Sequence, residues 1–359
     1  MEPTSESTGF QKAPPIGNFI IPVVDTPWSL PSMDPLPELG DTERATLIDT
    51  LRKNAKENEA DSTYWACLWL SDIECLREIV QVAECSQTSA SVMMTSQTAF
   101  TMIKTWQTRS RVFAVPLKMQ KQRHFGEDEN QKRKLTAKKA CLKRDDSCCV
   151  ITKCPLIDLA RIYPESLRKG QSSGTDNKYT QFWGGLRMFW SKDLVNKWEA
   201  RLTGPCGTEL CENLLCLCPD AHRYWGACYF ALEPLHLRND GKELITRFYW
   251  LPKVTPHIVQ VQDKPSISLH PYSDFVSLCF KSPDGSLRGM SSGDLVVFKT
   301  KDPENLPLPS WDLLQMQWIL SRIGAISGAA DASTLPWDWD TEDEDSNMEF
   351  EYDDDEDME

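Results

Sequence analysis

Hydrophobic residues recur at helical spacing in the first third of the chain. Leu47 and Leu51 follow Asp41, whose short acidic side chain suits the N-cap position of a helix. From Tyr64 to Val82, further hydrophobic residues fall on one broad face of a helix. These patterns predict a mainly helical region over residues 41–143.

After residue 144 the pattern changes to short hydrophobic runs separated by Gly and Pro, which is typical of strands and turns. Strands are expected at Glu243–Trp250, His257–Gln262, Ser266–Leu269 and Leu295–Lys299. One more helical pattern extends from about Ser310 to Ile326. Helices in one part of the chain and strands in another favour the α+β fold class.

Both ends of the chain have compositions that disfavour a packed fold. Residues 1–40 contain eight prolines, each of which fixes φ and lacks a backbone N–H, so we expect a Pro-rich disordered arm. Residues 331–359 form an acidic tail that we expect to be disordered, because its like charges repel one another. The chain therefore divides into this arm, the helical region over 41–143, a compact region over 144–330 and the tail.

The net charge of −14 belongs to the tail and not to the rest of the chain. Of the 53 Asp and Glu, fourteen lie between Asp338 and Glu359, which leaves 39 acidic against 39 basic residues. Ten Lys or Arg and three acidic residues lie between Lys118 and Arg144, a segment that we call the basic stripe. A solvated helix or linker is the favoured interpretation, and a nuclear-import or phosphate-contacting segment is the alternative. The acidic composition thus does not exclude nucleic-acid binding.

Cysteine usage and the N-terminal residues bear on the compartment. The first residues lack the basic and hydrophobic parts of a secretory signal, and no hydrophobic window predicts a membrane span. We expect an intracellular protein, nuclear or cytoplasmic, with no membrane partner and mostly free thiols. A structural zinc site is the alternative, but the cysteine spacing lacks the two-residue gaps of zinc ribbons, so packing as small hydrophobic groups is favoured. The cysteines concerned are Cys149, Cys154, Cys206, Cys211, Cys216 and Cys218.

Several segments of the compact region carry a distinctive combination of motifs. They read RDDSCCVIT at 144–152, LARIYP at 159–164, FWGGLRMFW at 182–190, GTELCENLLCL at 207–217, AH at 221–222 and PSWDLL at 309–314. Together these segments resemble the HNH nuclease-like proteins abundant in filamentous fungi. The resemblance covers roughly half of the chain and leaves out residues 1–140.

The resemblance implies a ββα-metal core within the α+β fold, extended by extra strands and a closing helix. In that family a histidine on the first strand acts as general base, an asparagine on the second strand orients it, and the helix offers a further metal ligand. The metal, of the Mg²⁺, Mn²⁺ or Ni²⁺/Zn²⁺ class, neutralises charge on the scissile phosphate while the imidazole takes a proton from water. By this resemblance Asn213 matches the asparagine, and His222 matches the second histidine, a metal ligand or its neighbour. Each also has an ordinary structural interpretation. Asn213 would hold backbone groups in place, and His222 would be a hydrogen-bonded structural histidine.

Two positions depart from the family pattern. Arg161 stands where the first histidine belongs, and an arginine stays charged and cannot act as a base. Gly226 stands where family members have an aspartate after the aromatic residue. None of the five histidines lies within twelve residues of Arg161. Asp158 would point to the opposite face of a strand, so we expect it to be an ordinary turn or solvent residue.

Three functions fit these observations. The favoured one is an HNH nuclease-like protein with a degenerate site, which binds DNA or another protein as a regulatory module and whose Arg161 contacts a phosphate. The second is an active divalent-metal-dependent endonuclease that uses His222 or another group that the sequence does not reveal. The third is a non-nuclease enzyme with a small-molecule substrate in an aromatic cleft, although those tryptophans are more simply core residues. The tryptophans concerned are Trp183, Trp190, Trp198 and Trp225.

The acidic tail is complementary in charge to the basic stripe and to any basic partner, which suggests autoinhibition. Deletion of residues 338–359 is expected to strengthen DNA binding, and added salt is expected to shrink the gain by screening the charges. A gel-shift titration of the full and the truncated chain at two salt concentrations measures this effect. Equal affinities of the two proteins for DNA would exclude autoinhibition by the tail.

Overall fold

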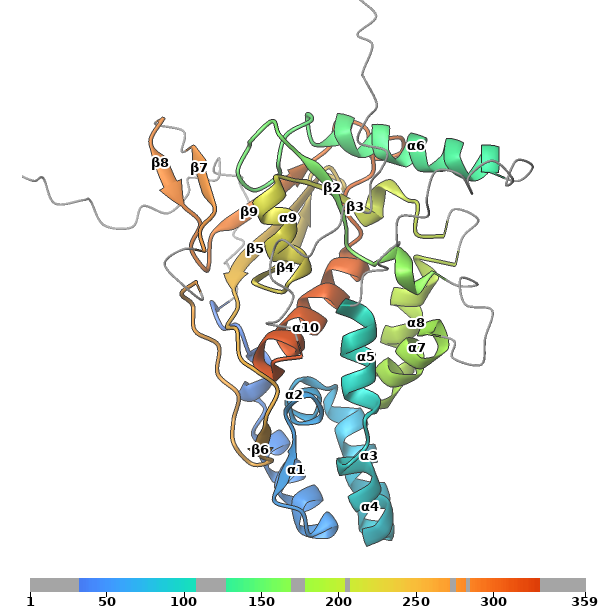
Figure 1. The fold of residues 1–359 in the computed structure, drawn as a ribbon, viewed down its shortest axis with the longest axis vertical. Helices are drawn as coiled ribbons and strands as arrows, with labels where there is room; N and C mark the ends of the chain where they lie inside the picture. Colours follow the sequence, from blue (N-terminus) through green and yellow to red (C-terminus); the bar gives the residue numbers. More distant parts are fainter. Residues whose placement is uncertain are drawn as a thin grey trace, which may run out of the picture. The chain divides into compact units, whose positions relative to one another are not determined.

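The computed structural model describes residues 32–107, 127–168, 178–203, 207–271, 276–281 and 285–329. Helices and small antiparallel sheets combine in it, which confirms the α+β fold class (Figure 1). Most of the arm expected over residues 1–40, and the whole tail expected over 331–359, lie outside the described residues. No helix within the described ranges is long and apolar enough to cross a membrane.

The helices fall into two groups along the chain, with η denoting 3₁₀ helices. The first group is η1 Pro37–Gly40, α1 Thr42–Ala55, α2 Ser62–Leu70, α3 Ile73–Cys85, α4 Gln87–Met94, α5 Thr98–Gln107 and α6 Glu127–Arg144. The second group is η3 Glu165–Leu167, α7 Lys178–Phe189, α8 Lys192–Ala200, η4 Cys211–Asn213, α9 Pro219–Gly226 and α10 Trp311–Ser327.

The strands of the described residues form four small antiparallel sheets. The two-stranded sheets are β1 Glu59–Asp61 with β6 Ile258–Gln260, β2 Asp158–Arg161 with β3 Leu214–Leu217, and β7 Cys279–Lys281 with β8 Leu287–Gly289. The three-stranded sheet has the order β4 Phe230–Arg238, β5 Glu243–Trp250 and β9 Leu295–Lys299. Because β5 is central and almost wholly buried, this sheet contributes one wall of the core.

Sequence patterns located three of the four expected strands. β5 and β9 coincide with their predicted ranges, and β6 lies within its own. The prediction of a strand at Ser266–Leu269 is wrong. Its hydrophobic side chains, Ile267 and Leu269, pack against the core, but this segment pairs with no strand among the described residues. Alternation alone does not make a strand, because the ladder of hydrogen bonds needs a partner.

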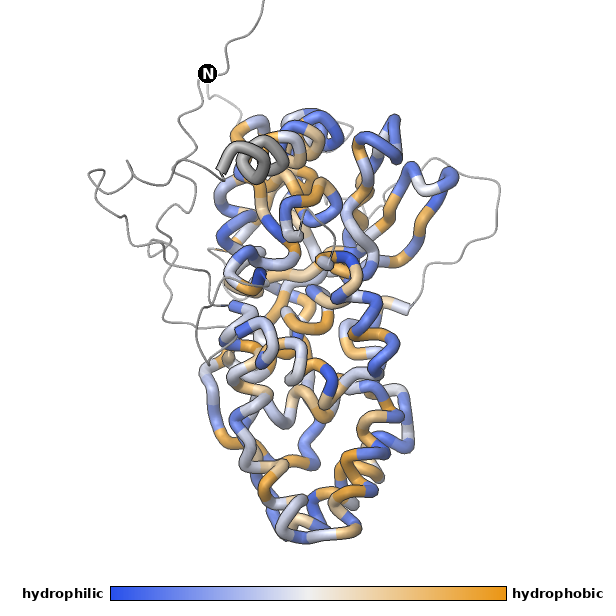
Figure 2. Tube along the Cα trace, turned by 90° about the vertical axis from the view of Figure 1, so that its right-hand side faces the viewer, coloured by the Kyte–Doolittle hydropathy of each residue, from blue (hydrophilic) through white to orange (hydrophobic). Residues whose placement is uncertain are grey.

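The helical region expected over residues 41–143 is mainly helical where the structure describes it, with residues 108–126 outside the described ranges, and it differs from the prediction at one break. Asp41 caps α1 as expected. The helix expected from Tyr64 to Val82 is interrupted at Asp72, where α2 ends and α3 begins. The Asp72 N–H donates to the carbonyl of Phe189, and its carboxylate accepts from the N–H of Ser191. These hydrogen bonds to distant residues outweigh the helical periodicity. Figure 2 shows hydrophobic and hydrophilic positions alternating along the helices at the lower end of the view.

Helix α10 lies between the three-stranded sheet and the helices α2, α5 and α8 (Figure 1). From Leu313 to Ser327 every residue except Gln315 is buried, so the helix is enclosed on all sides. Its start and end agree with the predicted helix from Ser310 to Ile326. Ser310 caps the first turn, and Gly328 ends the helix with a positive φ of 74°. The chain needs a glycine there, because a Cβ would lie 2.2 Å from a backbone carbon of the neighbouring loop.

The regions expected over residues 41–143 and 144–330 share one hydrophobic core. Helix α2 packs against α10, and α5 packs against α7. Their buried side chains belong to a single cluster. The early helices therefore depend on the later half of the chain to bury their hydrophobic faces.

A buried ion pair attaches η1 to α10. Arg322, which is 1% exposed, donates to both carboxylate oxygens of Glu38 at 2.8 Å. Its guanidinium lies 4.2 Å from the centre of the Trp318 ring. Arg44 of α1 donates to the Glu38 carbonyl at 3.1 Å. Burial raises the pKa of the Glu38 carboxyl, but the charge and hydrogen bonds of Arg322 outweigh it, so the pKa lies below its usual 4.5.

This ion pair makes the stability of the fold depend on pH. Because the folded chain lowers the pKa of Glu38, the pair contributes stability above pH 4.5 that is lost as the pH falls below that value. Glu38→Gln leaves Arg322 buried without its counter-charge, which costs about 3 kcal/mol of unfolding free energy near neutral pH. Urea denaturation between about pH 7 and pH 3 is expected to show this difference shrink in acid. A constant difference contradicts the assignment, and Glu59→Gln, at an exposed contact with Gln260, is the control.

Candidate functional site

Strands β2 and β3 and helix α9 form the ββα unit that the resemblance implies (Figure 1). The two strands are antiparallel, with Arg161 opposite Leu214 and Asp158 opposite Leu217. All four residues of β3 are buried, and α9 follows it directly. The indole N–H of Trp225 donates to the carbonyl of Arg161 at 3.2 Å. This hydrogen bond fixes the last turn of α9 against the end of β2.

Asn213 holds the segment that follows β2. Its side chain is completely buried. Its Oδ1 accepts the N–H of Tyr163 at 2.7 Å, and its Nδ2 donates to the carbonyls of Tyr163 and Thr208 at 3.0 Å. Its own carbonyl accepts the N–H of Ile162. All three of these side-chain hydrogen bonds join Asn213 to backbone groups. Asn213 therefore sets the path of the chain after Arg161.

Arg161 lies at the end of β2 between two carboxylates. Its Nη2 is 3.2 Å from Oε2 of Glu165 and 3.4 Å from Oε1 of Glu209. The side chain of Glu209 is 1% exposed, and that of Arg161 is 16% exposed. Both carboxylates thus bind the same nitrogen of the guanidinium. A phosphate would meet both carboxylates, so these ion pairs disfavour the phosphate contact expected of Arg161.

His222 lies in the first half of α9, against the start of β2. Its Nδ1 is 3.2 Å from Oδ2 of Asp158. The hydrogen bond with His222 lowers the pKa of the Asp158 carboxyl, against the opposing effect of burial. Asp158, expected to be an ordinary turn or solvent residue, is instead the residue that orients the His222 ring. A carboxylate on one ring nitrogen fixes both the tautomer and the direction of an imidazole.

A cavity opens beside Arg161 and the end of α9. It contains about 330 Å³ of empty space, part of it open to solvent. Arg161 and Gly226, which stand where the resemblance implies a histidine and an aspartate, both line it, and so does Trp225. The other three tryptophans of the expected aromatic cleft are at most 1% exposed and belong to the core; they are Trp183, Trp190 and Trp198. The cavity is therefore much smaller than a cleft formed by all four tryptophans.

The donors around His222 do not fit the divalent metal of an HNH active site. In the described part of the chain, three or more potential ligands of the His, Cys, Asp and Glu types gather only in a cysteine cluster on α6 and β3. His222 has Asp158 beside it, whereas Gly226 and Arg161 supply no donor where the resemblance places an aspartate and a histidine. A divalent metal in a catalytic site needs several such donors together.

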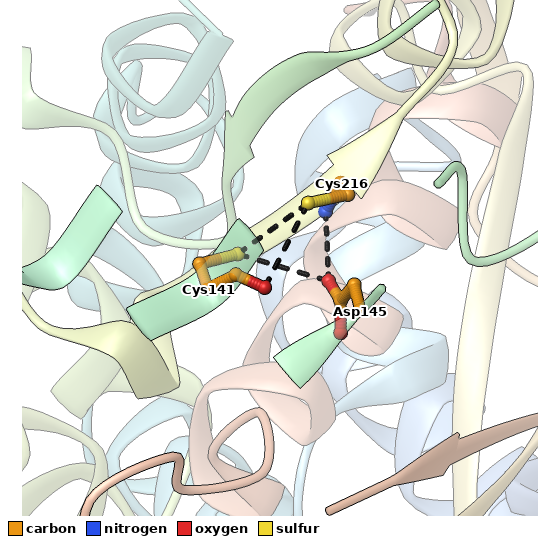
Figure 3. A group of neighbouring side chains, drawn as sticks. All are labelled: Cys141, Asp145 and Cys216. Carbon is orange, nitrogen blue, oxygen red and sulfur yellow. Dashed lines mark hydrogen bonds between the residues drawn. The ribbon is translucent and has the colours of Figure 1, made fainter. Parts of the chain in front are cut away.

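The cysteine cluster, formed by Cys141, Asp145 and Cys216, lies between the end of α6 and β3 (Figure 3). The two Sγ atoms are 3.9 Å apart, and the Sγ of Cys141 is 3.7 Å from Oδ2 of Asp145. The guanidinium of Arg144 already occupies the place of a cation. It donates to both Asp145 oxygens, at 2.7 and 2.9 Å, and approaches the Sγ of Cys141 at 3.3 Å. Burial raises the pKa of the Cys141 thiol well above its ordinary value, whereas a metal ligand is a thiolate. These residues therefore do not fit a zinc ion.

Arg144 joins the end of α6 to two other segments of the chain through backbone hydrogen bonds. It donates to the backbone carbonyls of Cys211, Leu214 and Pro307 at 3.0, 2.7 and 3.1 Å. Cys211 and Cys216 pack in a small hydrophobic cluster, which agrees with the packing role expected of them. Of the other cysteines considered for zinc, Cys206 lies outside the described residues. The C-terminal end of the basic stripe is therefore packed on η4 and β3 and is not fully solvated.

Residues 149–233 match a family model described as HNH endonuclease. The matched range contains β2, β3, α9 and the three residues carried over by resemblance, Arg161, Asn213 and His222. The chain thus contains an HNH-family domain, within the region expected over residues 144–330. No curated protein matches the chain, and no solved structure does.

The sequence alone did not predict the contacts that Glu165, Glu209 and Asp158 make in the site. Glu165 lies four residues after Arg161, a separation short enough to have suggested a local ion pair. Glu209 lies 48 residues from Arg161, and the two meet only because Asn213 binds the segments beside both. No pattern in the sequence expresses that proximity. The contact of Asp158 with the helix likewise depends on how α9 packs.

Replacement of Asn213 by alanine is expected to lower the unfolding free energy by about 2–4 kcal/mol, because buried backbone groups of Tyr163 and Thr208 lose their partner. Urea denaturation measures the change. The matched control is Asn196→Ala at an exposed position of α8, where a change within about 0.5 kcal/mol is expected. A loss no larger than that of the control would show that Asn213 does not pin the segment after β2.

Proposed function

We propose that the HNH-family domain is a nucleic-acid-binding regulatory module with a degenerate catalytic site, which does not hydrolyse phosphodiesters. The observation that carries this proposal is the position of Arg161 at the end of β2, in ion pairs with Glu165 and Glu209. The resemblance gives that position to the histidine that acts as general base. A guanidinium stays protonated at cellular pH and cannot accept a proton from water.

The surroundings of Arg161 support the same interpretation. The two carboxylates compensate its charge, so the partly buried guanidinium has ion-pair partners in the folded chain. Gly226 offers no carboxylate where the resemblance places one. Arg161 and Gly226 line the same cavity. A domain that does not hydrolyse phosphodiesters is expected to lack a base and a metal donor at such positions.

The basic stripe supports nucleic acid as the partner. In its described part, Lys139 and Lys143 of α6 are exposed, while Arg144 is buried and ties the helix to the ββα unit. Exposed lysines on an anchored helix can lie along a phosphate backbone and release its counterions. DNA is the form of nucleic acid that we propose, and a protein partner is the outcome that a negative binding test would favour.

An active metal-dependent endonuclease is the second candidate, and the contact between His222 and Asp158 favours it. Metal-ligating histidines commonly hold a carboxylate on the ring nitrogen that does not bind the metal. The Nδ1 of His222 has this arrangement. The candidate requires a base other than Arg161 and metal donors in addition to His222.

A plasmid assay separates the two candidates. We expect the full chain to retard supercoiled plasmid in a gel without nicking it, in the presence of Mg²⁺, Mn²⁺ or Ni²⁺, because no base is available at position 161. His222→Ala is expected to behave in the same way. Metal-dependent nicking that disappears in His222→Ala would overturn the proposal and make His222 catalytic.

The reverse substitution tests the position itself. Arg161→His restores a side chain that titrates near neutral pH, and a gain of nicking in this variant would trace the lost activity to that residue. Arg201→His, at an exposed position after α8, is the matched control and is expected to gain nothing. A full chain that neither retards nor nicks the plasmid would contradict nucleic-acid binding.

A further inference from the structure

Two thiols meet beside the ββα unit, outside the site described above. Cys149 lies in the segment between α6 and β2, and Cys218 is the N-cap residue of α9. Their side chains form a hydrogen bond with each other. Cys149 is fully buried, and Cys218 is 9% exposed. Because the neighbouring Cys148 and Cys154 are partly exposed, the pair lies close beneath the surface of the molecule.

Backbone hydrogen bonds hold the turn that carries Cys149 against the end of β3. The Cys149 N–H donates to the Cys154 carbonyl at 2.9 Å, and the Thr152 N–H donates to Sγ of Cys149 at 3.3 Å. The Val150 N–H donates to the Cys216 carbonyl at 2.9 Å. Because α9 begins directly after β3, this last bond keeps Cys149 beside the start of the helix. The Cβ atoms of a disulfide lie about 3.8 Å apart, so two thiols already in hydrogen-bonding contact need only a small movement to be joined.

The two thiols differ in their tendency to lose a proton. Hydrogen bonds from the Cys218 thiol and from Thr152 lower the pKa of the Cys149 thiol below its ordinary value, although burial opposes them. The backbone N–H of Cys218, at the start of α9, acts in the same direction. The hydrogen bond with Cys149, together with burial, raises the pKa of the Cys218 thiol. Cys149 is therefore suited to be the thiolate nucleophile, and Cys218 remains a thiol beside it.

A metal ion does not account for this pair of thiols. In the part of the chain that the structure describes, three or more potential ligands gather only in the cysteine cluster of Cys141, Asp145 and Cys216. Cys149 and Cys218 thus have no third described His, Cys, Asp or Glu side chain close enough to share an ion with them. A structural zinc ion takes four ligands, so the pair is better suited to redox chemistry between its own two sulfurs.

We propose that Cys149 and Cys218 form a reversible disulfide in the presence of a hydroperoxide. The Cys149 thiolate attacks one oxygen of hydrogen peroxide, the O–O bond breaks, and a sulfenic acid and hydroxide form. The hydroxide takes a proton from solvent and becomes water. The Cys218 sulfur then attacks the sulfenic sulfur, the S–S bond forms, and the S–O bond breaks, with the thiol proton leaving in a second water. The two thiols lose two electrons, the peroxide gains them, and a dithiol reductant reverses the reaction.

The inference goes beyond the proposed function and does not depend on it. A disulfide here would join the segment before β2 to the first residue before α9, the helix that carries His222. The link would therefore restrict how the strand and the helix of the ββα unit can separate from each other.

Peptide mass spectrometry of the full chain tests the inference. The protein is treated with hydrogen peroxide, its remaining thiols are alkylated in urea, and the monomer band of a non-reducing gel is digested. We expect Cys149 and Cys218 in one cross-linked pair in most of the molecules, and dithiothreitol is expected to separate them. Peroxide treatment in urea, where the turn and the helix no longer meet, is expected to remove the preference for this pair.

A second pair of thiols in the same protein provides the internal control. The Sγ atoms of Cys141 and Cys216 are 3.9 Å apart, so proximity alone would also join them. Both residues are completely buried, and burial raises the pKa of the Cys141 thiol, so we expect both to be recovered alkylated. A cross-link restricted to Cys149 and Cys218 would therefore reflect the chemistry of that pair.

Substitutions separate the two roles. In Cys218→Ser the sulfenic acid on Cys149 has no thiol to meet, so dimedone is expected to label Cys149 after peroxide treatment. Cys279→Ser, at an exposed cysteine of β7, is the matched control and should form the cross-link as the unaltered chain does. If Cys218→Ser fails to fold, the cross-links of the unaltered chain decide the question.

Three results would overturn the inference. They are the absence of a cross-link between Cys149 and Cys218, an equal yield of the cross-link between Cys141 and Cys216, and a yield of the first cross-link that is unchanged in urea. Metal-dependent plasmid nicking would overturn the proposed function alone and leave these cross-links unchanged. The two proposals therefore fail separately.

Discussion

The enclosure of α10 on all sides is the constraint on which the rest of the structure depends. A helix that buries nearly every residue needs partners in every direction, and here they are a sheet on one side and helices from both halves of the chain on the others. Its polar residues are consequently forced into specific pairings. Arg322 binds Glu38 and so draws η1 onto the core, while the side-chain nitrogen of Gln317 donates to Ser321 within the helix. The same packing therefore produces both an anchor to another element and a hydrogen bond within the helix.

The ββα unit is held by backbone contacts more than by its own side-chain chemistry. Arg144, Asn213 and Trp225 all hydrogen-bond to main-chain carbonyls, and together they fasten α6, η4 and α9 to the two strands. None of these contacts requires a histidine at position 161 or a carboxylate at position 226. The ββα arrangement therefore does not depend on the side chains at these two positions. This independence is consistent with a match to the family model over a segment in which the described residues gather no cluster of metal donors around His222.

The periodicity of hydrophobic residues and the presence of capping residues were sufficient to predict those helices and strands whose burial follows a simple pattern. The helix from Ser310, the cap at Asp41 and strands β5 and β9 follow from spacing alone. The break at Asp72 and the unpaired segment at Ser266–Leu269 depend on partners that are distant in sequence, and no local pattern encodes them. The site divides in the same way. Resemblance singled out Asn213, His222 and Arg161 as candidates, whereas the carboxylates around them come together only through tertiary packing.

The hydrogen bond from Trp225 to the carbonyl of Arg161 has a consequence for substitutions at this position. It uses the main chain, as do the strand pairing with Leu214 and the contacts of Asn213 with the residues that follow, so these contacts do not depend on the identity of side chain 161. A change of side chain 161 therefore leaves these main-chain contacts in place. Its cost falls instead on the two carboxylates that bind the guanidinium, and above all on Glu209, whose side chain is 1% exposed.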